Sequence, residues 1–182
     1  MKRNFLTYLP LLLFASLIVA LDQWTKWLVR TNIPFTNSWL PEGWDWLSPY
    51  ARIVHWQNTG AAFGIFQNGN TVFSVLAIIV IIVILYYYPL VEKSEWYLRL
   101  AMGMQLAGAA GNLVDRLTRG EVTDFISVGR FPVWNVADAS ITVGVGVLLL
   151  GVWLKERAEK RKASDEIPAV SEQSSSHPTP WE

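Results

Sequence analysis

The chain of 182 residues contains no cysteine and only two histidines, and charged residues make up only 16% of it. The absence of cysteine excludes disulfide bonds, thiolate catalysis and soft metal sites. One histidine, His177, lies in a polar C-terminal stretch, so His55 alone does not allow a convincing histidine-based zinc site or Ser-His-Asp triad. We therefore expect no metal and no cofactor, and we expect any reactive groups to be carboxylates.

The scarcity of charge accompanies a hydrophobic content of 52% and 10 tryptophans, which is too apolar for an ordinary soluble domain of this length. Apolar runs occupy Leu9–Leu21, Val72–Tyr88, Tyr97–Val114 and Val136–Leu154. With its flanks, each run approaches the roughly 20 residues that cross a bilayer as a helix. We therefore predict a mainly α-helical membrane protein with four transmembrane helices. The net charge of zero gives no argument for a nucleic-acid partner.

The first apolar run follows Lys2 and Arg3, a pattern that cleaved signal peptides share. We favour a retained helix, because the run continues into Leu21-Asp22-Gln23-Trp24 without a small-residue cleavage site. The basic residues then predict cytoplasmic N- and C-termini, because more Lys and Arg fall on that side than on the outer side. Most tryptophans lie on the outer side, where amphipathic rings favour the membrane interface.

The segment between the first two apolar runs is too long for a simple connection. We predict a membrane domain over residues 1–155, in which residues 31–70 form an extracytoplasmic β-cradle insertion. The alternating stretch Ala51-Arg52-Ile53-Val54-His55-Trp56 predicts a strand there. The last helix should continue through Lys155–Lys162, and residues 156–182 should form a charged cytoplasmic tail that is disordered from Ser164 onward.

Small residues recur at Gly103, Ala107 and Gly111, and again at Ser140 and Gly144. This four-residue spacing places them on one helix face and predicts close helix packing.

With this topology, unusual polar residues converge on the outer membrane face. They are Asp22, Lys26, Asn58, Asn112, Asp115, Arg116, Asp124, Asn135 and Asp138. Ionisable groups near hydrocarbon cost a few kcal/mol or more, so they are usually paired, exposed to a water-filled cavity or used chemically. Their joint placement favours a functional site.

Each of these residues also has a simple structural interpretation. Asp22 and Lys26 have the i,i+4 spacing of a pair that supports a helix end. Asn135 has the sequence position of an N-cap, with Asp138 at the third helical position. Arg116 could neutralise its neighbour Asp115 or extend toward the interface. The remaining candidates could be a turn residue at Asn58, a helix-bridging amide at Asn112 and a solvated loop carboxylate at Asp124.

The chemistry that fits a pair formed by Asp124 and Asp138 is hydrolysis. Two close carboxyl groups do not both ionise easily, so one keeps a proton while the other acts as a base toward water. The protonated member can polarise a carbonyl, and the leaving nitrogen later receives a proton without a covalent intermediate.

Five ordered blocks resemble the family of bacterial lipoprotein signal peptidase, or signal peptidase II, over about Leu6 to Leu154. The blocks are Leu21-Asp22-Gln23-Trp24-Thr25-Lys26, Asn58-Thr59-Gly60-Ala61-Ala62-Phe63, Gly108-Ala109-Ala110-Gly111-Asn112-Leu113-Val114-Asp115-Arg116, Val122-Thr123-Asp124-Phe125 and Asn135-Val136-Ala137-Asp138. The departures are small, with Ala107 where the family often has Gly and Trp134 where it often has Phe.

The resemblance implies an aspartic endopeptidase that cleaves prolipoproteins before a diacylglyceryl-modified cysteine. It implies a multi-pass protein of the bacterial cytoplasmic (inner) membrane with its active site at the outer, periplasmic face, a β-cradle between the first two helices and a short outer helix between the third and fourth. The implied roles are catalysis for Asp124 and Asp138, substrate binding or support of the pair for Asn58, Gly60, Asn112, Arg116 and Asn135, and a structural role for Asp22, Lys26 and Asp115. Membrane lipid surrounds such an enzyme, and we expect no obligate protein partner.

Two other classes of function remain as alternatives. A proton-coupled transporter would use intramembrane Asp and Arg to relay ions, but it would place them near the midplane and often shows repeat symmetry. A structural scaffold would use asparagines and small residues only to pack helices. An assay of precursor cleavage distinguishes all three.

Overall fold

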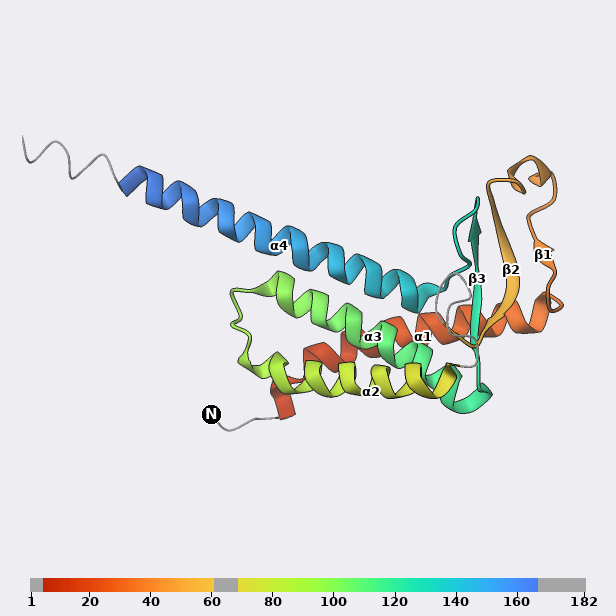
Figure 1. The fold of residues 1–182 in the computed structure, drawn as a ribbon, viewed down its shortest axis with the longest axis horizontal. Coiled ribbons are helices and arrows are strands. Elements are labelled where there is room, and N and C mark those ends of the chain that lie inside the picture. The colour runs from red at the N-terminus through yellow and green to blue at the C-terminus, as the bar shows by residue number, and fades with distance from the viewer. Residues whose placement is uncertain (1–4, 61–68, 167–182) are drawn as a thin grey trace, which may run out of the picture.

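The structure is a computed structural model of the chain, and it describes residues 5–60 and 69–166. Four long helices run side by side, and a small sheet lies at one end of them (Figure 1). The elements in chain order are η1 Phe5–Thr7, α1 Leu9–Asn32, β1 Ser38–Trp39, η2 Asp45–Leu47, β2 Ala51–Asn58, α2 Asn70–Tyr87, η4 Tyr88–Leu90, α3 Trp96–Arg119, β3 Val122–Val128 and α4 Val136–Glu166. The predicted mainly helical fold with a small sheet is confirmed.

Three of the helical segments are long and apolar enough to cross a membrane. They are Leu9–Asn32, Asn70–Leu90 and Val136–Ala163. Helix α3 is also long, but it is less apolar, because it carries Arg99 and, near its end, Asp115 and other charged residues. Length and composition thus support three of the four predicted transmembrane helices, and a crossing by α3 stays a prediction.

Helix α3 differs because it packs against each of the other three long helices (Figure 1). Ten of its residues are buried, including Gly108, Asn112 and Asp115. A helix surrounded by protein can carry polar side chains where a lipid-facing helix cannot, because neighbouring helices supply their partners. Helix α2, by contrast, exposes a long series of Val, Ile and Leu side chains, as expected for a surface in contact with lipid.

Two apolar clusters hold these elements together. The first joins α1, α3 and η4, which directly follows α2, through Leu11, Met102, Leu106 and Tyr88. The second consists of Val29, Ile33 and Phe125, and it fixes the end of α1 against β3. The sheet is therefore anchored to the helices through side chains of α1.

The sheet has the strand order β1-β2-β3, and both strand pairs are antiparallel. Strand β2 confirms the predicted strand over Ala51–Trp56 and extends it to Asn58. Strand β3 was not predicted, and the short outer helix that we expected between α3 and α4 is wrong, because residues 120–135 contain no helix. The stretch Val122–Val128 is rich in β-branched and aromatic residues and pairs with β2, so the cradle draws its third strand from outside residues 31–70.

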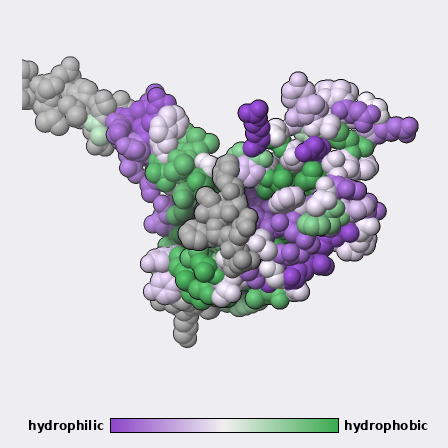
Figure 2. Space-filling view, turned by 45° about the vertical axis from the view of Figure 1, so that its right-hand side comes forward, coloured by the Kyte–Doolittle hydropathy of each residue, from purple (hydrophilic) through white to green (hydrophobic). Residues whose placement is uncertain are grey.

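The start of α1 and the end of α4 both lie at the end of the molecule opposite the sheet (Figure 1). Helix α4 continues through the charged stretch to Glu166, as predicted for Lys155–Lys162, so the first part of the expected disordered tail is helical. The remainder of that tail, residues 167–182, lies outside the described residues. Hydrophilic side chains gather at this end of α4, and hydrophobic ones follow along the helix (Figure 2).

The predicted close packing occurs at several glycines. A Cβ at Gly103 would lie 2.8 Å from Phe14 Cδ1 of α1, and one at Gly111 would lie 2.8 Å from Asp22 Oδ2. At Gly108 a Cβ would collide with the carbonyl oxygen of Ala137 and with the side chain of Ile141.

We predict that Gly108→Ala lowers the free energy of unfolding by about 1 to 3 kcal/mol, because a backbone carbonyl of α4 must move to admit the methyl group. Thermal unfolding of the purified protein in detergent measures this. Gly146→Ala is the matched control, since a Cβ at Gly146 meets nothing within 4 Å. Equal stability of the two variants would contradict the close α3–α4 approach.

Candidate active site

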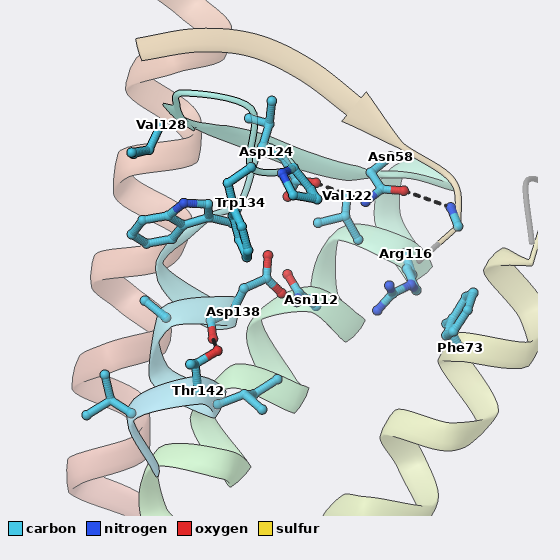
Figure 3. Close-up of a pocket in the computed structure, with 17 residues that line it drawn as sticks. Asn58, Phe73, Asn112, Arg116, Val122, Asp124, Val128, Trp134, Asp138 and Thr142 are labelled. Carbon is cyan, nitrogen blue, oxygen red and sulfur yellow. Dashed lines mark hydrogen bonds between the residues drawn. The ribbon is translucent and has the colours of Figure 1, made fainter. Parts of the chain in front are cut away.

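The two predicted catalytic aspartates lie on different elements and line one cavity. Asp124 is in the middle of β3 and is 1% exposed, whereas Asp138 lies in the first turn of α4 and is partly exposed. The cavity has a volume of about 790 Å³. Asn58, Gly60, Asn112 and Arg116 also line it, so of the residues predicted for catalysis, substrate binding or support of the pair, only Asn135 is outside the lining (Figure 3).

The rest of the cavity wall is largely apolar. It includes Phe73, Val128, Phe131, Pro132, Trp134 and Ile141. Apolar walls with a few convergent polar groups are typical of sites that bind a ligand and exclude most water. In this cavity the polar lining residues include the two aspartates and their neighbours Asn58, Asn112 and Arg116.

Asp138 is held by the cap of its own helix. The side-chain oxygen of Asn135 accepts a hydrogen bond from the Asp138 N–H at 3.0 Å, and Asp138 Oδ2 accepts one from the Asn135 N–H at 3.3 Å. This reciprocal pair has the arrangement of a capping box. The predicted N-cap is confirmed, and it orients Asp138 toward the cavity.

The same asparagine also reaches the second aspartate. Asn135 is fully buried, and its Nδ2 donates to Asp124 Oδ1 at 2.6 Å and to Asn112 Oδ1 at 3.1 Å. Asn112 in turn donates from Nδ2 to Asp138 Oδ1 at 2.8 Å. Asn135 and Asn112 therefore connect the two carboxyl groups through a chain of amide hydrogen bonds.

Asn58 holds the other oxygen of Asp124. Its Nδ2 donates to Asp124 Oδ2 at 3.0 Å, while its Oδ1 accepts from the Gly60 N–H at 2.9 Å in a local turn. The strand register explains the contact, because Asp124 pairs with Trp56 and Asn58 is two residues farther along β2 on the same face. Every carboxyl oxygen of the pair thus has at least one protein donor.

A buried ion cluster, which we define as Asp22, Lys26 and Asp115, is connected to Asp138 through Asn112. The Lys26 ammonium lies 2.8 Å from Asp22 Oδ2 and 3.1 Å from Asp115 Oδ2, and it donates to Asn112 Oδ1 at 3.0 Å. All three members of the cluster are 0% exposed. The interpretation of Asp22 and Lys26 as a simple pair at a helix end is therefore incomplete, because a third charge and an amide complete the cluster.

The ion cluster also fixes the elements that carry the two aspartates. Asp22 Oδ1 accepts from the Ala137 N–H at the start of α4, at 2.9 Å. Asp115 Oδ2 accepts from the Thr123 N–H in β3, at 3.2 Å. The residues next to Asp138 and Asp124 in the chain are thus bonded to the same buried charges.

Arg116 does not pair with Asp115, which was one of its predicted roles. Its guanidinium carbon lies 5.5 Å from the ring centroid of Phe73, within the range of a cation–π contact (Figure 3). Its Nε is buried and has no hydrogen-bond partner among the described residues. Arg116 is therefore a cation at the cavity wall, held against the Phe73 ring.

Sequence reasoning missed two residues that support the cluster. Gln23 donates to Gly111 O at 3.1 Å and to Asp115 Oδ1 at 3.2 Å. Arg30 donates to Thr123 Oγ1 at 3.1 Å and lies 3.8 Å from Asp115 Oδ1. Arg30 follows Lys26 by four residues, so helical spacing could have found it, but nothing in the sequence links Asp115 to Thr123.

The environment of Asp124 changes its acidity. Burial raises the pKa of Asp124 to about 7, and the Asp138 carboxylate adds to the rise, while hydrogen bonds from Asn58 and Asn135 oppose it. A carboxyl group with such a pKa can carry a proton near neutral pH and release it. Among the described residues, no three His, Cys, Asp or Glu side chains come together as a possible metal site. The raised pKa of Asp124 and its position beside Asp138 support acid–base chemistry near neutral pH.

The chain is similar to proteins of one family. A family model described as signal peptidase (SPase) II matches residues 14–154. A lipoprotein signal peptidase of Shouchella clausii is 42% identical over 81% of this chain and 95% of its own length, and one of Halalkalibacterium halodurans is 37% identical over 81% and 94%. A solved bacterial membrane enzyme superposes with a TM-score of 0.71 at 30% identity, covering 83% of this chain and 91% of that enzyme.

The raised pKa of Asp124 predicts a pH dependence of stability. The pKa of Asp124 in the folded protein, about 7, exceeds the ordinary value of 3.8. Between pH 3.8 and about pH 7 the folded protein therefore keeps a proton on Asp124 that the unfolded chain has released. Stability from this group is complete below about pH 4 and is lost as pH rises through 7. Relative to Asp124→Asn, which does not ionise, the wild type should lose up to about 4 kcal/mol over this range. Unfolding measured in detergent from pH 4 to 8 checks this, and a constant difference would contradict it.

Proposed function

We propose, from the premise that this chain belongs to the signal peptidase II family, that it is an aspartic endopeptidase whose catalytic pair is Asp124 and Asp138. Family membership makes the chain a protease that cleaves signal peptides from lipoproteins. The apolar helices and the similarity to a bacterial membrane enzyme make it a multi-pass membrane protein. To this we add the hydrolytic mechanism, the catalytic residues and the orientation of the protein in the membrane.

One observation carries the proposal. Two carboxyl groups from separate elements, Asp124 of β3 and Asp138 of α4, face the same apolar cavity, and protein amides hydrogen-bond all of their oxygens. A carboxylate with a purely structural role needs its own hydrogen-bond donors, but it does not need a second carboxyl group facing the same cavity. A pair held in this way, with one member close to neutral pKa, supports a shared proton and a water-activating base.

The proposed reaction uses water as the nucleophile. The ionised carboxylate removes a proton from water while the water oxygen attacks the scissile carbonyl carbon, and the protonated carboxyl gives its proton to the carbonyl oxygen. The tetrahedral intermediate then breaks its C–N bond: the carboxyl that took the proton from water gives it to the leaving nitrogen, and a hydroxyl of the intermediate returns a proton to the other carboxylate. The pair ends with one proton, as it began, and no covalent intermediate forms. The two titrations belong to the pair.

The neighbouring polar residues either bind the substrate or orient the catalytic pair. Arg116 brings a positive charge to the cavity wall, and Asn58 and Asn112 each donate to one of the two carboxyl groups. Gly60 continues the turn at Asn58 and lines the cavity. We assign Arg116 to the substrate and the asparagines to the catalytic pair.

The position of the site supports the proposed membrane setting. The cavity lies at the sheet end of the helices, opposite the start of α1 and the end of α4 (Figure 1). We propose that this end faces the periplasmic side of the bacterial inner membrane, with both termini in the cytoplasm, in line with the distribution of basic residues. A signal-peptide helix could then enter from the bilayer while the acyl chains of the diacylglyceryl-cysteine stay in lipid.

We expect Asp124→Asn and Asp138→Asn each to reduce cleavage by at least about a thousandfold, because each removes either the base or the proton carrier. Release of signal peptide from a diacylglyceryl-modified precursor by the purified protein in lipid measures this. Asp45→Asn is the matched control, since Asp45 is exposed and lies in η2. Near-normal turnover by either site variant in a folded protein would refute the catalytic pair.

A precursor without the diacylglyceryl group should be a much poorer substrate, because it loses the acyl chains that hold it in the bilayer beside the site. Steady-state rates on matched lipid-modified and unmodified precursors test this. Equal values of kcat/KM for both would argue against the proposed lipid requirement while leaving the catalytic pair unaffected.

A further inference from the structure

The Lys26 ammonium uses all of its hydrogen-bonding capacity. It has three donors and no acceptor, and it meets three oxygens, those of Asp22, Asp115 and Asn112, at 2.8, 3.1 and 3.0 Å. Two carboxylates already outnumber the single ammonium, so charge balance does not require the amide. The third donor therefore serves the orientation of Asn112.

That orientation is set by Lys26 together with Asn135, whose Nδ2 donates to the same Asn112 oxygen at 3.1 Å. An ammonium only donates, so the amide oxygen of Asn112 must face it, and the Asn112 NH₂ must point the other way. The NH₂ group donates to Asp138 Oδ1 at 2.8 Å. Without Lys26, only the Asn135 amide, which is shared with Asp124, would hold the Asn112 oxygen, and Asn112 could turn and present that oxygen to Asp138.

Asp138 and Asp124 then differ in how well each tolerates charge. Asp138 accepts from Asn112 and from a backbone N–H in the first turn of α4, where the helix dipole favours an anion, and it is partly exposed. Asp124 is 1% exposed on a strand that offers no comparable dipole. The raised pKa of Asp124 agrees with this difference. The charged and titratable groups that surround the pair are Asp22, Lys26 and Arg30 from α1 and Asp115, Arg116 and Arg119 from α3.

We propose that Lys26 is a positioning residue for the reaction: through Asn112 it holds Asp138 as the ionised, water-activating carboxylate and leaves the shared proton on Asp124. This inference rests on the proposed function of the pair. It assigns Asp138 as the base and Asp124 as the proton donor to the scissile carbonyl. It also gives Lys26 a role in the reaction that a purely structural ion pair would not have.

The first test compares pH profiles of kcat/KM for the full chain in lipid with a diacylglyceryl-modified precursor. Asn112→Ala removes a donor from the Asp138 carboxylate proposed as the base, so the acidic limb of the profile should move up by about one to two pH units while the alkaline limb stays. Asn58→Ala removes a donor from Asp124, so it should raise the alkaline limb instead. The reverse pattern would assign the ionised carboxylate to Asp124 and overturn the proposal.

The second test isolates Lys26. Lys26→Met/Asp22→Asn and Lys26→Met/Asp115→Asn each remove one positive and one negative charge, so the net charge of the cluster is kept. Either should lower kcat by about 10- to 100-fold and cause no further loss in an Asn112→Ala background, because both changes break the same path. The matched control, Lys155→Met/Glu95→Gln, removes an exposed pair 2.9 Å apart and should leave kcat unchanged.

Losses that multiply with Asn112→Ala, or an unchanged kcat, would overturn the positioning role of Lys26. Failure of both double variants to fold would assign Lys26 to folding alone and would also overturn it.

Infrared spectroscopy tests the proton without turnover, so it separates this inference from the proposed function. At about pH 5 the band of a buried protonated carboxyl should be present in the wild type, absent in Asp124→Asn and retained in Asp138→Asn. Loss of the band in Asp138→Asn instead would overturn the assignment. Full cleavage activity in both variants would refute the proposed function, whatever the infrared result.

Discussion

Burying a lysine ammonium away from water costs several kcal/mol, and this chain offsets the cost by surrounding Lys26 with oxygens from α1 and α3. The two carboxylates that face Lys26 are themselves tied to backbone N–H groups at the start of α4 and in β3. One buried charge therefore holds α1, α3, α4 and strand β3 in register. The cavity and its two aspartates depend on that register.

The same residues serve the fold and the site. Asn135 begins α4 as an N-cap and also donates to Asp124. Asp138 completes the cap with an oxygen that also faces the cavity. A cap and a catalytic carboxylate looked like competing explanations of the sequence, yet the geometry satisfies both. The polar groups gather at one end of the helices beside the sheet, which argues against a transporter that relays ions at the midplane.

The local features were predictable from the sequence. Apolar runs located the helices, alternation located β2, and the Asn135–Asp138 spacing located the cap. The features set by long-range contacts were not. Strand β3 exists because Val122–Val128 pairs with β2 more than 60 residues earlier in the chain, and the partner of Arg116 is Phe73 rather than its neighbour Asp115. The burial of Lys26 likewise required Asp115, which no periodic pattern connects to it.

The proposed function depends on peptide hydrolysis between Asp124 and Asp138. The most direct measurement is a structure of the Asp138→Asn protein in lipid with an intact diacylglyceryl-modified precursor bound. The account predicts that the scissile carbonyl lies between positions 124 and 138, with its oxygen within hydrogen-bonding distance of Asp124 and a water beside residue 138. A scissile bond bound outside this cavity, or carboxyl groups turned away from it, would contradict the account.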